Sequence, residues 1–239
     1  MDDTINRVIE LIKKNRNNVL DGGINCIPSP FTGFRHDFVG TQQKKYYLIS
    51  AQQKAGKTQL TSYIFIFNNL LYAYHHPDQV RIKIFYYSLE EPKEDVVMRF
   101  MSYLLYTISN HNTRISPEDL QSVNEKNIVP QEVIDTLETK EYKDILDFFN
   151  DHVIFEESTN PTGVWKDLNN YADSHGKTHY KEREFVDRET GEIKKKRVFD
   201  YYEPDDPGEY VEIIWDHISL TSLERGMNLR QSIEKQSVS

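Results

Sequence analysis

The chain has 239 residues, 38% hydrophobic and 28% charged, which is enough for one large or two small domains with a buried core. Its formal net charge of −9 excludes a uniformly basic nucleic-acid-coating protein, so any contact with nucleic acid must use a local patch. The single Cys26 excludes an internal disulfide framework, and no apolar run approaches the ~20 residues of a membrane span; we expect a cytoplasmic protein without membrane contact.

The first third of the chain predicts a helix, a loop-rich segment and a strand. Residues 4–17 have apolar side chains at helical spacing, and this stripe must pack either on its own domain or on a neighbouring subunit. Residues 21–43 are rich in Gly and Pro, which predicts turns. The apolar run that follows, residues 44–50, predicts the first buried strand.

Strands and helices then alternate. A helical pattern runs from the loop at 51–58 to about residue 75, and residues 81–87 predict a second strand. Pro92 opens another helix, because a proline at the first helical position loses no hydrogen bond. Residues 111–150 are predicted to be helical and mostly polar, with helix starts at Ser116–Pro117 and Pro130–Gln131.

The last third predicts a strand at 152–155, a helix from Asn160–Pro161, a charged hairpin at 179–202 and a buried strand at 210–218. Residues 221–239 begin a polar helix. We therefore expect an α/β fold, with a mainly parallel sheet, helices on both faces, a helical insert at 111–150 and a β-hairpin insert at 179–202.

A phosphate-binding loop is the clearest chemical motif. The stretch Ala51-Gln52-Gln53-Lys54-Ala55-Gly56-Lys57-Thr58 lies between the predicted strand and the predicted helix. Glycine at position 56 lets the backbone approach a phosphate, the Lys57 ammonium reaches its oxygens, and the Thr58 hydroxyl is a ligand for Mg²⁺. Ala51 stands where the usual pattern has its first glycine, and the alternative to a phosphate site is a solvated turn.

Two acids complete the predicted site. Asp216 ends an apolar run, where the carboxyl ends of parallel strands gather ligands, so it is predicted to hold Mg²⁺; the alternative is an acid that only ends a strand. Glu90 follows the second strand and is predicted to orient and polarise the attacking water. Glu91 is expected to point into the first turn of the next helix, and His217 to play a packing role.

The hairpin contains the strongest local basic patch. Lys194, Lys195, Lys196 and Arg197 lie near several tyrosines, so contact with phosphates and bases is one interpretation. Acidic residues of the opposite strand, such as Glu182 and Glu184, face them. We favour a self-neutralising surface hairpin on this pattern.

Together these motifs resemble the RecA-like ATPase domain of DnaB-type replicative helicases, and in overall character they are most similar to phage-encoded helicases. The resemblance rests on Ala51–Thr58, on the strand that ends in Ser88-Leu89-Glu90, and on Ile213–Ile218 with Asp216, and it covers roughly residues 20–235. It implies a linker helix at 1–20, an incomplete ATPase domain at 21–239, and bound ATP and Mg²⁺, with Lys57 and Glu90 catalytic and Thr58 and Asp216 at the metal. The family's later sensor strand and arginine finger have no counterpart in 221–239, so we expect a truncated chain with weak activity or none.

The function implied is an ATP-dependent helicase motor that translocates on single-stranded DNA during replication. Its implied partners are further copies of the chain in a ring, a hexamer in the full-length protein, and a primase or other replisome protein, in the host cytoplasm if a phage encodes it. Two alternatives stay open: a RecA- or KaiC-like recombination or regulatory ATPase, and a phage structural or assembly protein that binds nucleotide without hydrolysing it.

Overall fold

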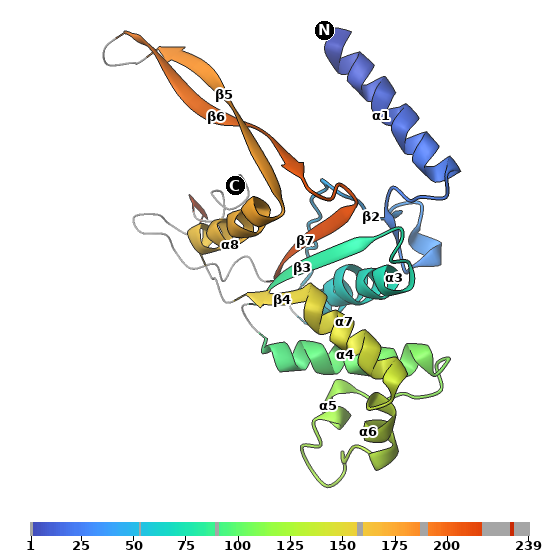
Figure 1. Cartoon of the computed structure of the whole chain (residues 1–239). Coiled ribbons are helices and arrows are strands. Elements are labelled where there is room, and N and C mark those ends of the chain that lie inside the picture. Colours follow the sequence, from blue (N-terminus) through green and yellow to red (C-terminus); the bar gives the residue numbers. More distant parts are fainter. Residues whose placement is uncertain are drawn as a thin grey trace. The chain divides into compact units, whose positions relative to one another are not determined.

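The computed structural model describes residues 2–52, 54–88, 91–156, 160–186, 191–216 and 230–231. The chain divides into two compact units (Figure 1). The first unit comprises Met1–Glu157 and Tyr210–His217, and the second comprises Ser158–Glu209 and Ile218–Ser239. The predicted tail helix at 221–239 lies outside the described residues apart from 230–231, which are helical.

The first unit opens with a long helix, α1 (Asp2–Leu20), which extends the predicted helix at both ends. Its apolar stripe is exposed to solvent: Ile5 is 59% exposed and Ile12 is 60% exposed. Two-residue strands β1 (Ile27–Pro28) and β2 (Gly40–Thr41) then pair antiparallel on either side of a 3-10 turn, η1 (Thr32–Phe34). Gly40 is required here, because a Cβ at this position would lie 1.9 Å from the Ile27 carbonyl oxygen.

The strand predicted at 44–50 is wrong. Residues 45–50 have no regular secondary structure, and Tyr46 and Leu48 are 76% and 73% exposed. The alternate residues are half-buried, and the Tyr47 hydroxyl donates to the Gly40 carbonyl. A strand needs a neighbour that satisfies its backbone N–H and C=O groups, and no described strand pairs with this segment. Within the apolar run, Tyr47 and Ile49 are the residues that pack against the hydrophobic core.

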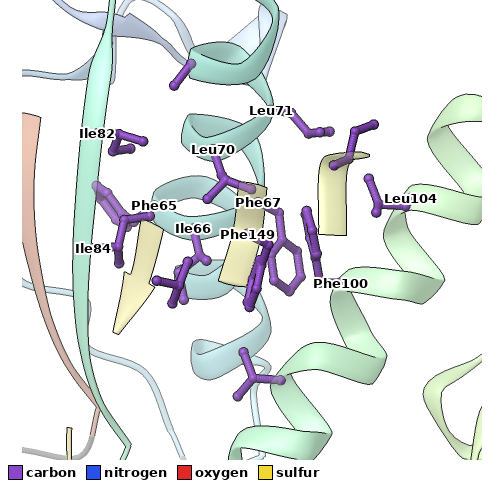
Figure 2. Close-up of a cluster of buried hydrophobic side chains, with 14 of the residues drawn as sticks. Phe65, Ile66, Phe67, Leu70, Leu71, Ile82, Ile84, Phe100, Leu104 and Phe149 are labelled. Carbon is purple, nitrogen blue, oxygen red and sulfur yellow. The ribbon is translucent and has the colours of Figure 1, made fainter. Parts of the chain in front are cut away.

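A continuous helix from residue 57 to residue 75 passes through the core. It comprises α2 (Lys57–Thr61), a π-helical segment η2 (Ser62–Asn68) and α3 (Asn69–His75). Figure 2 shows its buried side chains between strand β3 and the helix that carries Phe100. The ring centroids of Phe67 and Phe100 are 5.2 Å apart, and Phe149 stacks on Phe100 at 4.6 Å. This aromatic cluster fixes the helix against the sheet layer.

The sheet of the first unit has three parallel strands in the order β4-β3-β7 and is flanked by helices (Figure 1). The central strand β3 (Arg81–Ser88) is nearly all buried, as a strand covered on both sides requires. Helix α4 (Lys93–Ile108) follows it, and β4 (Val153–Glu156) pairs along one edge. Strand β7 (Glu209–Asp216) was predicted to be buried, but it alternates: Val211 and Ile213 are 43% and 51% exposed.

The segment 111–150 is helical as predicted. Ser116 forms a capping box with Asp119 at the start of α5 (Pro117–Leu120), and α6 (Gln131–Leu137) begins after Pro130. Helix α7 (Lys140–His152) buries Tyr142, Ile145 and Phe149 and contacts both α3 and β4. The second half of this segment is therefore part of the hydrophobic core.

In its described residues, the second unit contains helix α8 (Pro161–Ser174), one long hairpin and the two helical residues 230–231. Helix α8 is capped by Asn160, whose side chain accepts from the Gly163 N–H, and it buries Val164 while Trp165 is 53% exposed. The predicted hairpin is confirmed and is longer than expected. Strand β5 (Gly176–Val186) pairs antiparallel with β6 (Ile193–Pro204), and the turn residues 187–190 lie outside the described part.

Candidate phosphate and magnesium site

The predicted phosphate loop leads directly into the core helix, as the motif requires, but the strand that the motif places before the loop does not form among the described residues. Lys54 and Gly56 both have left-handed backbone conformations, with φ of 62° and 82°. A Cβ at Gly56 would contact only the Gln59 side chain, at 3.8 Å, so the glycine is needed for its conformation and not for space. Gln53 lies outside the described residues.

The structure brings the end of the loop to Asp216, which lies 158 positions further along the chain. The Thr58 hydroxyl donates to the Asp216 carboxylate at 2.8 Å, and the Lys57 ammonium lies 3.9 Å from its other oxygen. Asp216 is the last residue of β7 and is 6% exposed. A buried carboxylate needs such partners, because desolvation of an unpaired charge is costly.

A cavity of about 480 Å³ opens beside the loop. It is lined by Ile49, Ser50, Ala51, Ala55, Gly56, Lys57, Gln59, Leu60 and Tyr63. The two ends of the predicted loop, Ala51 and Gly56–Lys57, therefore share one cavity, and Ile49 and Ser50 form part of its wall.

Glu90 lies outside the described residues, but its neighbours are placed. Glu91 pairs with Arg99 of α4 through both carboxylate oxygens, and its backbone is tied to the Ser88 hydroxyl. The prediction that Glu91 points into the first turn of the next helix is wrong: Glu91 lies before α4 and pairs with Arg99 in the second turn, and the acids of the first turn are Glu94 and Asp95. His217 also lies outside the described part.

Aromatic rings pack around the end of β7. Trp215 stacks on Tyr87 of β3, with ring centroids 5.0 Å apart. Burial, and after it the charge of the Asp216 carboxylate, raise the pKa of Tyr86 well above its usual range. Because neighbours along a strand point to opposite faces, the Trp215–Tyr87 stack lies on the other face of the sheet from Asp216, while Tyr86 is close enough to feel the carboxylate's charge.

A second buried acid lies on β7, four residues before Asp216. Glu212 accepts a hydrogen bond from the Asn69 amide at 2.8 Å, and the same amide nitrogen lies 2.8 Å from the Thr41 hydroxyl. Burial raises the pKa of Glu212 to about 8, and the Asn69 bond lowers it by a smaller amount. Sequence reasoning missed these three residues. Period-two alternation along β7 puts Glu212 on the face of Asp216, and this signal was present in the sequence.

A larger cavity of about 940 Å³ lies between α4, α7 and the ends of β3 and β4. Its polar lining includes Ser88, Glu91, Lys93, Glu94, Asn150 and Glu156. Of these, Glu91 is paired with Arg99. Within the described residues there is no group of three His, Cys, Asp or Glu side chains suited to a metal.

The fold and site define an α/β protein in which a phosphate-loop sequence meets an acidic strand end. No protein-family model, curated protein or solved structure matches the chain. In the described part of the chain, no helix has both the length and the apolar character needed to cross a membrane.

Proposed function

We propose that the chain is a phosphate-loop nucleoside triphosphatase that binds ATP with Mg²⁺. The observation that carries the proposal is the contact between Thr58 and Asp216. The Thr58 hydroxyl lies at the start of the loop's helix, and the Asp216 carboxylate lies at the end of a parallel strand. The two groups are hydrogen-bonded at 2.8 Å although their residues are 158 positions apart in the sequence. A hydroxyl and a carboxylate are the oxygen ligands that Mg²⁺ takes from proteins in such sites.

The residues present fit this ligand. Lys57 supplies a cation beside the loop, and Gly56 adopts the conformation that leaves its backbone unobstructed. Bound Mg²⁺ would neutralise charge that develops on the phosphates. The Thr58 hydroxyl and the Lys57 ammonium both contact Asp216, which keeps the two side chains directed at the site.

Glu90 is the proposed catalytic acid/base. Glu91 and Arg99 form a bidentate pair, so Glu91 is committed to a structural contact at the end of β3. Its neighbour Glu90 is then the acid of this pair that remains for orienting water near a γ-phosphate.

The finer proposal is a RecA-like helicase motor of the DnaB type, working as a ring on single-stranded DNA. It is supported by the acid-ending β7 beside β3 in one parallel sheet, with the start of the loop's helix at Asp216, and by α1, whose apolar stripe is 44–60% exposed at Ile5, Val8, Ile9 and Ile12. A stripe of this kind suits packing on a neighbouring subunit in a ring. A RecA- or KaiC-like ATPase would share the same site.

The test is Mg²⁺-dependent ATP hydrolysis by the full chain, with and without single-stranded DNA. Lys57→Ala and Asp216→Asn should each abolish turnover, and Lys57→Ala should also weaken binding of a fluorescent ATP analogue. Lys45→Ala, which removes an exposed charge just before the loop, is the matched control and should behave as wild type. Turnover that persists in both site variants would overturn the assignment. Nucleotide binding without hydrolysis would favour an assembly protein.

A further inference from the structure

The cavity beside the phosphate loop extends past the loop, along the first turns of the core helix. Three of its lining residues, Gln59, Leu60 and Tyr63, lie three, four and seven positions after Gly56, and these positions share one face of a helix. At 1.5 Å per residue, the cavity therefore reaches about 10 Å from Gly56 to Tyr63. Its volume of about 480 Å³ lies within the range of roughly 300–1,000 Å³ that is usual for small-molecule sites.

The end of the cavity that lies away from the loop is apolar. Leu60 is 40% exposed there, and Ile49 lines the same space. The Tyr63 ring is held in place by the Phe31 ring, with centroids 5.3 Å apart, and by the Tyr103 ring at 5.6 Å. Phosphate groups gain nothing from a leucine or an aromatic ring, whereas a flat base gains from contact with both. This end therefore suits the part of a nucleotide that carries no charge.

Two polar side chains are placed along the cavity at different distances from the loop. The Gln59 amide lies beside the loop, since its oxygen would be 3.8 Å from a Cβ at Gly56, and the Tyr63 hydroxyl lies further along. Neither side chain forms a hydrogen bond within the described part of the chain. Burial raises the pKa of Tyr63, so its hydroxyl stays protonated at neutral pH and can donate. Sugar hydroxyls and base edges offer the matching donors and acceptors.

We propose that this cavity is the nucleoside subsite of the phosphate loop, with the sugar beside Gln59 and the base against Leu60 and Tyr63. The inference rests on the proposed function, because phosphates held by the loop would direct the rest of the nucleotide into the cavity that the loop shares. A loop that served inorganic polyphosphate would need neither the apolar end nor the two polar side chains.

The experiment is isothermal titration calorimetry of the full chain with Mg²⁺-ATP and with Mg²⁺-tripolyphosphate, which carries the phosphates without sugar or base. Wild type should bind ATP at least about tenfold more tightly than tripolyphosphate. Leu60→Ala should weaken ATP binding about fivefold and change tripolyphosphate binding less than about twofold. The matched control Leu48→Ala removes the same side chain from a 73% exposed position outside the cavity lining and should change neither affinity. Equal affinities of wild type for the two ligands, or equal losses in Leu60→Ala, would overturn the subsite.

Tyr63→Phe tests the hydroxyl and keeps the ring contacts with Phe31 and Tyr103. Loss of one hydrogen bond should weaken ATP binding about threefold to tenfold and leave tripolyphosphate binding unchanged. An unchanged affinity for ATP would refute the contact with the hydroxyl. If Leu60→Ala unfolds at a lower temperature than wild type, Tyr63→Phe decides the question, since it preserves the packing.

Lys57→Ala separates a failure of the subsite from a failure of the proposed function. It should weaken both ligands, because both carry the phosphates that Lys57 contacts. If Lys57→Ala changes neither affinity while Leu60→Ala weakens ATP binding, the phosphate loop is wrong and the nucleoside subsite stands. If Lys57→Ala weakens both ligands while Leu60→Ala and Tyr63→Phe change nothing, the loop stands and the subsite is wrong. Wild type that binds neither ligand would refute both.

Discussion

Glu212 offers a direct test of the buried network, through the substitution Glu212→Gln. The side chain is 8% exposed, and burial raises its pKa to about 8 from the usual value of 4.5. Between these two values the unfolded chain releases the proton while the folded chain retains it. The free energy of unfolding must therefore fall as pH rises from about 4.5 and level off above about 8.

The size of the effect follows from the same two pKa values. A pH of 7 lies about 2.5 units above the pKa of the carboxyl in the unfolded chain. At 1.36 kcal/mol per unit, the folded state is about 3 kcal/mol less stable at pH 7 than near pH 4.5. Glutamine keeps the carbonyl oxygen that accepts from Asn69 and does not titrate. The free energy of unfolding of Glu212→Gln should therefore exceed that of wild type by about 3 kcal/mol at pH 7, and the two values should match near pH 4.5.

The assay is urea unfolding followed by circular dichroism at a series of pH values. Glu138→Gln removes an equal charge from an exposed position and serves as the control, whose pH profile should follow that of wild type. If the profiles of wild type and Glu212→Gln run parallel between about pH 5 and pH 8, the carboxyl ionises normally in the folded state and the reasoning fails.

Three other substitutions test separate parts of the fold by the change in unfolding free energy. Phe100→Ala removes a fully buried ring that contacts Phe67 and Phe149 and should cost about 3–5 kcal/mol; a cost under about 1 kcal/mol would show that the cluster is loosely packed. Ser116→Ala removes the capping box of α5 and should lower the free energy of unfolding by about 1 kcal/mol. Ser122→Ala removes a hydroxyl that accepts a hydrogen bond from the Val129 N–H, and it should leave the free energy of unfolding unchanged if that bond contributes nothing. Gly56→Ala would place its Cβ in ordinary contact with the Gln59 side chain and should cost about 1 kcal/mol from the left-handed backbone; a much larger loss would mean that the side chain clashes.

The sequence predicted elements best where periodicity and caps agree. The helices that start at Ser116, Pro130 and Asn160 begin where their capping residues indicate, and β3 and the hairpin also fall where expected. The strand prediction for residues 44–50 failed because an apolar run indicates only that some side chains are buried. Whether a strand forms depends on a neighbouring strand, and that information is not local.

The candidate site was predictable in part for the same reason. Lys57, Thr58 and Asp216 carry motif signals and do lie together, although the strand predicted before the loop, on which their proximity was argued, does not form. Asn69 and Thr41 carry no such signal, because an amide and a hydroxyl gain importance only from the buried Glu212 that they contact. Which side chains of the hairpin share a face also needed the exact strand register, since a shift of one residue would move every side chain to the other face.

The stack of Trp215 on Tyr87 gives the molecule an internal optical probe. The chain has only two tryptophans, and the other, Trp165, belongs to the second unit and is 53% exposed. In a Trp165→Phe background, all indole emission would come from the residue next to Asp216. Events at the site could then be timed by stopped-flow fluorescence without a label, and in the unsubstituted chain the two emission bands would let each unit's unfolding be followed separately.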